Sequence, residues 1–113
     1  MNYKIATTKD FEGNFKRLFK KYRSLYDDLE GFKKELLENP TMGDDLGNQM
    51  RKVRMAIAAK GKGKSGGARV ITCTTLVDVE NAKIYLLTIY DKGEQQSISK
   101  QAIAYLKEKS GLG

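Results

Sequence analysis

Residues 69–90 read RVITCTTLVDVENAKIYLLTIY, and this stretch decides the fold. Its two halves, 69–77 and 83–90, are rich in the β-branched and aromatic residues that favour strands. The segment 78–81 between them has the composition of a turn, so the two runs are predicted to pair as a hairpin. Because the second run is apolar at almost every position, we expect residues 83–90 to form a central strand that is covered on both faces.

Two amphipathic helices are predicted upstream of this hairpin. In the first, one apolar stripe at helical spacing consists of Phe11, Phe15, Leu18, Phe19 and Tyr22. In the second, which begins after Ser24 and ends at Asn39-Pro40, the stripe consists of Leu25, Leu29, Phe32 and Leu36. Only two or three residues separate the helices, so we expect an antiparallel helical hairpin.

The remaining elements are shorter. Residues 3–6 form a weak strand, with Thr7 or Thr8 as the cap of the first helix, and residues 40–48 are predicted to form a loop. A third strand follows, in which Val53, Met55 and Ile57 point to one face. A short C-terminal helix is predicted to begin at Ser97 or Ser99.

The predicted order is therefore β-α-α-β-β-β-α. This order indicates an α+β fold in which an antiparallel sheet packs against a helical hairpin. A length of 113 residues fits a single domain, residues 1–113, because neither side of any candidate loop contains enough apolar residues for a core of its own.

Composition excludes several kinds of site. The chain has one cysteine and no histidine, so it has no internal disulfide, no multi-cysteine zinc site and no histidine base, and we expect no metal or other cofactor. Cys73 is interpreted as a packing residue. Asp27-Asp28 is interpreted as a pair that interacts with the helix dipole in the first turn of the second helix, and Asp44-Asp45 as part of a solvated loop, with magnesium binding as a minor alternative. No apolar run approaches the roughly 18 residues of a membrane span, which predicts a cytoplasmic protein with no membrane partner.

The positive charge is concentrated in one part of the chain. The net charge is +7, and no acidic residue lies between Asp45 and Asp78, whereas the basic residues there are Arg51, Lys52, Arg54, Lys60, Lys62, Lys64 and Arg69. A local excess of positive charge is typical of proteins that bind a polyanion. A solvated Lys/Gly loop at 60–67 is the alternative; a nucleotide-binding loop is disfavoured because Ala58 stands where its first glycine would be.

Lysine, arginine and tyrosine are sufficient for one reaction without metal or histidine. In RNA cleavage by attack of the 2′-hydroxyl on the adjacent phosphate, the enzyme supplies a base, an acid and fixed positive charge. The composition permits this reaction, but clusters of positive charge bind nucleic acid far more often than they cleave it.

Two segments carry a resemblance to a known family. Residues 60–71, KGKGKSGGARVI, and residues 84–94, IYLLTIYDKGE, resemble the HigB-like branch of the RelE/ParE superfamily, the toxins of type II toxin–antitoxin systems. The resemblance implies a RelE-like fold and a ribosome-dependent mRNA endonuclease, or mRNA interferase, that inhibits translation. Gly93 and Met55 depart from the pattern, since relatives often have an arginine and a tryptophan at these places.

The resemblance also implies roles for individual residues. Arg69 would stabilise the transition-state phosphate, Tyr90 would stack on a base, and Lys92 would assist proton transfer, with Lys64 as a further catalytic candidate. The residues expected to bind RNA phosphates are Lys52, Arg54, Lys60, Lys62 and Lys64.

The expected partners are a helix-turn-helix antitoxin of the HigA type, the ribosome and mRNA, with operator DNA bound only through the antitoxin. Two alternatives remain. One is a non-nucleolytic toxin of the same scaffold, such as a ParE-like gyrase inhibitor. The other is a simple basic nucleic-acid-binding module, in which Arg69→Ala would change only the salt-dependent affinity.

Overall fold

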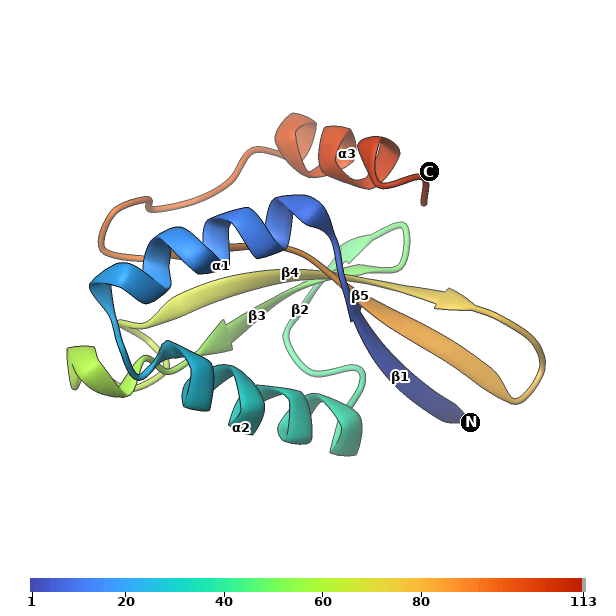
Figure 1. Ribbon diagram of the computed structural model, residues 1–113. Helices are drawn as coiled ribbons and strands as arrows, with labels where there is room; N and C mark the ends of the chain where they lie inside the picture. Colours follow the sequence, from blue (N-terminus) through green and yellow to red (C-terminus); the bar gives the residue numbers. More distant parts are fainter. Residues whose placement is uncertain (113) are drawn as a thin grey trace.

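The structure is a computed structural model that describes residues 1–112 (Figure 1). It contains three α-helices, one 3₁₀ turn and five strands, which confirms the α+β class. In chain order the elements are β1 (Asn2–Thr7), α1 (Lys9–Lys21), α2 (Leu25–Glu38), β2 (Asp44–Gly47), β3 (Met50–Met55), η1 (Ala58–Lys60), β4 (Ala68–Leu76), β5 (Asn81–Asp91) and α3 (Lys100–Lys109).

The strands form one sheet in the order β1-β5-β4-β3-β2. The predicted hairpin of β4 and β5 is confirmed as an antiparallel pair. The prediction of a wholly antiparallel sheet was wrong, because β1 lies parallel to β5. Parallel neighbours need a long connection, and the segment from residue 8 to residue 80 supplies it. A strand pattern determines which residues share a face but not which distant strand is the neighbour.

The prediction of a loop over 40–48 was also wrong in part, because Asp44–Gly47 forms the edge strand β2. It pairs antiparallel with β3 through a two-residue turn in which Asn48 has φ 52° and Gln49 has φ 66°. Positive φ at both central residues is the geometry of a type I′ hairpin turn. The polar composition of β2 hides it from a hydrophobicity pattern.

Each face of the sheet has its own core. The helical hairpin packs on one face through residues that include Phe11, Leu18, Phe32, Val53, Met55, Val70, Ile84 and Leu86. Helix α3 packs on the other face through Met50, Ile71, Cys73, Leu87 and Ile103. Strand β5 contributes Leu86 to the first core and Leu87 to the second, so the predicted double coverage is confirmed for this strand except at Lys83, which is exposed.

The helix caps explain how the chain enters each helix. Thr8 caps α1, since its hydroxyl accepts from the Phe11 N–H at 3.1 Å, and Ser99 caps α3 in the same way. Ser24 stands at the start of α2 but makes no capping bond. Its hydroxyl donates to Asp28 and accepts from the Ala59 N–H, so it attaches η1 to the start of α2.

Gly67 allows the loop after η1 to lie against β3. A Cβ at this position would overlap the carbonyl oxygen of Met55 and the backbone of Ala56 and Ile57. Backbone can come this close only where no side chain intervenes. The glycine therefore fixes where β4 begins beside β3.

We expect Gly67→Ala to lower the free energy of unfolding by roughly 2 kcal/mol, because the new methyl group forces β3 and the loop apart. The matched control is Gly13→Ala on α1, where a Cβ meets nothing within 4 Å. That variant should gain about 0.5–1 kcal/mol of helix propensity. Urea unfolding of both variants measures the two changes, and a gain in stability for Gly67→Ala would contradict the close approach.

Candidate nucleic-acid interface

The alternation of β3 divides its side chains between the two faces. Val53 and Met55 belong to the core under the helical hairpin, so Arg54 lies on the face that carries α3. In the register of the sheet Arg54 is opposite Arg69 of β4, and Arg69 is opposite Tyr90 of β5. The three side chains form a row across three strands, which we call the basic row.

Exposure differs sharply along the basic row. Arg54 is exposed, whereas Arg69 is 6% exposed and Tyr90 is 4% exposed. The connection from β5 to α3 turns back along the sheet (Figure 1), and Ile98 in it packs against the core under α3. A polyanion on the surface therefore meets Arg54, while the other two residues of the row are covered.

Arg69 holds the Gly/Lys loop in place. Its guanidinium donates to the backbone carbonyls of Lys64, Ser65 and Ala68, each at 3.1 Å. These bonds turn the loop over the start of β4. They leave the positive charge in place, since a carbonyl oxygen does not neutralise it.

Tyr90 is a proton donor rather than a base at neutral pH. Burial raises the pKa of its phenol above the ordinary value of 10.0, and the neighbouring charge of Arg69 only partly offsets this. A protonated phenol beside a fixed positive charge suits the protonation of a leaving oxygen.

Two of the lysines predicted to bind RNA are paired with carboxylates. The Nζ of Lys60 lies 2.6 Å from Oδ1 of Asp91, and its side chain is only 10% exposed. The Nζ of Lys64 lies 2.7 Å from Oε2 of Glu35, although its side chain is half exposed. The sequence between Asp45 and Asp78 contains no acidic residue, but the fold brings Glu35 of α2 and Asp91 of β5 next to its lysines.

Besides Arg69, four cations of the predicted site have no carboxylate partner. Within residues 1–112 no ion pair involves Lys52, Arg54, Lys62 or Lys92. Lys92 lies beside the loop, because its N–H donates to the carbonyl of Gly67, and its Nζ donates to the carbonyl of Gln96. Lys52 lies two residues before Arg54 on the same face of β3. It is half-buried, and its register partner in β2 is Asp44.

Sequence reasoning missed Asp91, the residue around which this end of the molecule is built. Its buried carboxylate accepts from the Tyr22 hydroxyl at 2.7 Å, from Lys60 and from the Gly93 N–H at 2.9 Å. Burial by itself favours the neutral acid, but these bonds outweigh it and lower the pKa of Asp91 to about 2. An acidic residue at the end of an apolar strand was the only signal in the sequence.

The other predicted features have simpler outcomes. Cys73 is fully buried in the core under α3, and burial raises the pKa of its thiol, which agrees with a packing role. Met55, at the place of the family's tryptophan, is buried under the helical hairpin and faces away from Arg54. Among residues 1–112, no group of three or more acidic or cysteine side chains is arranged to hold a metal ion.

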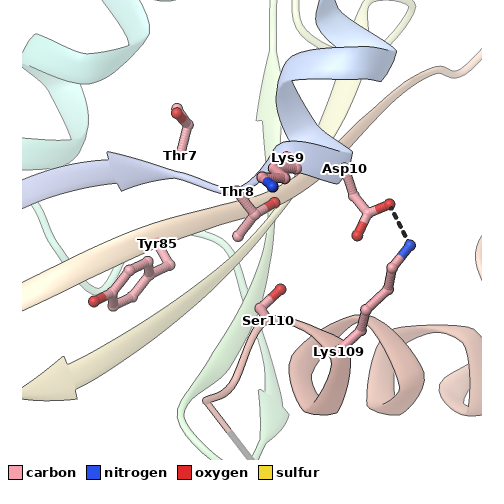
Figure 2. A pocket seen from close by; sticks show the side chains of 7 residues that line it. All are labelled: Thr7, Thr8, Lys9, Asp10, Tyr85, Lys109 and Ser110. Atoms are coloured by element: carbon pink, nitrogen blue, oxygen red, sulfur yellow. Dashed lines mark hydrogen bonds and ion pairs between the residues drawn. The ribbon is translucent and has the colours of Figure 1, made fainter.

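A cavity of about 360 Å³ lies outside the basic row, between the start of α1 and the end of α3 (Figure 2). Asp10 and Lys109 form an ion pair of 3.2 Å at this cavity. None of the predicted site residues lines it. We interpret the pair as an attachment of α3 to the rest of the fold.

None of the helices in the described part of the chain is long and apolar enough to span a membrane. A comparison of the sequence with models of known protein families finds no match.

Acid should reveal the Asp91 contacts. Folding lowers the pKa of Asp91 from 3.8 to about 2. The contribution of this carboxylate to the free energy of unfolding is therefore present in full above about pH 5, and it is lost as the pH falls to about 2. The difference amounts to roughly 2 kcal/mol. Asp91→Asn should lower the free energy of unfolding by about 3 kcal/mol at pH 7, because Lys60 then stays buried without a counterion. The free energy of unfolding of this variant should also fall less steeply with decreasing pH than that of the wild type.

The control is Glu94→Gln, which removes exposed ion pairs to Arg17 and Lys21 and should cost less than about 1 kcal/mol. Unfolding by urea at several pH values between 2 and 7 measures both variants. An acid dependence in Asp91→Asn equal to that of the wild type would contradict the role of this carboxylate.

Proposed function

We propose that the protein is the toxin component of a type II toxin–antitoxin system, with a RelE-like fold, and that it cleaves mRNA on the ribosome. The observation that carries the proposal is the basic row, in which an exposed arginine, a buried arginine and a protonated tyrosine stand in register on one face. Free cations surround this row at the same end of the sheet.

The row fits the chemistry of phosphodiester cleavage. Arg54, Lys62 and Lys92 bind phosphates of the strand, and Arg69 supplies the fixed charge for the transition state. When the 2′-hydroxyl attacks phosphorus, the bond to the 5′-oxygen breaks, and Tyr90 donates the proton that this oxygen takes up. The proton of the 2′-hydroxyl passes to a general base, for which Lys64 and Lys92 are the candidates beside the row.

Cleavage requires that the cover over the row moves. Residues 93–97 are exposed, and Ile103 is the one buried residue of α3, so the connection to α3 buries little apolar surface. It is held mainly by the ion pairs of Glu94 with Arg17 and Lys21 and by the bond from Lys92 to Gln96. Contact with the ribosome would then displace this connection together with the Gly/Lys loop whose carbonyls Arg69 binds, and give RNA access to Arg69 and Tyr90. If Arg69 and Tyr90 become accessible only after this movement, the enzyme would cleave RNA on the ribosome and not in free solution.

The burial of Arg69 and Tyr90 also favours a second candidate, a toxin that does not cut RNA. In that case the two residues only support the loop, and the target is a protein such as DNA gyrase. Inhibition of DNA supercoiling without loss of translation would identify this function. In both candidates a helix-turn-helix antitoxin is the proposed partner, whereas a simple nucleic-acid-binding module would be harmless when expressed.

Primer extension on an mRNA with translating ribosomes tests the cleavage. We expect cuts that require ribosomes, and Tyr90→Phe should reduce their rate roughly 100-fold, because it removes the proton donor but keeps the ring. Tyr105→Phe, at an exposed tyrosine of α3, is the matched control and should cut normally. Unchanged cutting by Tyr90→Phe would remove this residue from the mechanism, and no cutting by the wild type would overturn the nuclease proposal.

Binding is tested separately. Arg54→Ala should weaken binding to a short single-stranded RNA and reduce the slope of log K against log salt by about 0.7, the loss of one phosphate contact. Lys34→Ala, at an exposed lysine on the opposite face, removes the same charge and should leave the slope almost unchanged. Equal losses in the two variants would indicate a general effect of net charge instead of a site.

A further inference from the structure

Strand β1 has one edge without a partner. It lies at the end of the sheet, with β5 as its only neighbour (Figure 1). The N–H of Asn2 donates to Glu80 and the N–H of Thr8 donates to Leu86. Since backbone groups alternate along a strand, the N–H and C=O groups of Tyr3, Ile5 and Thr7 point away from β5. Within residues 1–112 no other element bonds them.

The two edges of the sheet are not alike. The opposite edge, β2, has four residues, an irregular register at Asp45 and two adjacent carboxylates. Short, charged and irregular edges prevent further pairing. Strand β1 has six residues in unbroken register, without proline or bulge, and is therefore the edge on which another strand can add.

The charge beside this edge selects the partner. Lys4 of β1 and Lys83 of β5 are register partners, and both are exposed on the face that carries α3. No ion pair within residues 1–112 neutralises either lysine. Like charges side by side on a sheet repel each other. Pairing of β1 with β1 of a second copy would add to this repulsion, whereas acidic side chains would relieve it.

The other face of the same edge is apolar. Tyr3 and Ile5 are half-buried and pack against the core under the helical hairpin. Helix α2 contacts β1 on this face. A strand that adds to β1 would place alternate side chains beside this apolar surface.

We infer that the free edge of β1 binds an extended segment of a partner protein in which apolar and acidic residues alternate. The main chain of the segment would pair with Tyr3 and Ile5, its acidic side chains would meet Lys4 and Lys83, and its apolar side chains would lie on the side of α2. This inference does not depend on nuclease activity, because it concerns the end of the sheet away from the basic row.

Two synthetic peptides test it: acetyl-Thr-Val-Glu-Val-Glu-Val-Thr-amide and the same peptide with lysine in place of glutamate. With the acidic peptide, hydrogen exchange followed by NMR should slow at the amides of Tyr3 and Ile5. Exchange at Asn2 and Lys4 should not change, because these amides already bond β5. The basic peptide should bind about fivefold to tenfold more weakly.

Charge reversal provides the control. In the double variant Lys4→Glu with Lys83→Glu, the preference should switch to the basic peptide. The double variant Lys16→Glu with Lys34→Glu, at exposed lysines of α1 and α2, changes the net charge equally and should still prefer the acidic peptide. The inference is overturned if neither peptide slows exchange at Tyr3 and Ile5, or if both bind equally well. It is also overturned if these amides become protected at higher protein concentration without peptide, which would show that a second copy occupies the edge.

Discussion

The buried carboxylate of Asp91 is the interaction on which the basic end of the molecule depends. It ties the end of α1, through Tyr22, to η1, through Lys60, and to the turn after β5, through the Gly93 N–H. A buried carboxylate is tolerated only where charge and hydrogen bonds compensate its desolvation. Lys60 and the N–H of Gly93 therefore have to lie where they do, and the path of the loop between Lys60 and β4 follows from that requirement.

The same contacts explain why a basic sequence window is not the same as a basic surface. Lys60 forms an ion pair with Asp91, and Lys64 forms one with Glu35. The charge of Arg69 is covered by the Gly/Lys loop whose carbonyls it binds. Positive charge available to a ligand is left on Lys52, Arg54, Lys62 and Lys92. Counting charges along the chain overestimates the site, because pairing between distant elements decides which charges remain free.

Local patterns predicted the parts of the fold that local chemistry determines. The hairpin of β4 and β5, the stripes of α1 and α2 and the stop at Asn39-Pro40 all follow from residues close in sequence. The parallel neighbour of β1, the polar strand β2 and the contacts of Asp91 depend on residues far apart in sequence, which no pattern displays. Alternation did place Arg54 and Lys52 on the face away from Val53 and Met55, but it did not show that Arg69 and Tyr90 would be covered.

The two proposed contact regions lie at opposite ends of the sheet, and this separation limits how a protein partner could inhibit the proposed activity. Along β5, Lys83 and Tyr90 are separated by about 23 Å at the usual rise of a strand. A segment bound at β1 therefore does not reach Arg54 or cover the basic row. Under the proposed function, inhibition from β1 would act through the bulk of the partner, which would keep the protein from entering the ribosome, and Arg54 would stay accessible to a short RNA in the complex. A partner that instead covers the row would compete directly with RNA, so retention of RNA binding by the complex distinguishes the two modes.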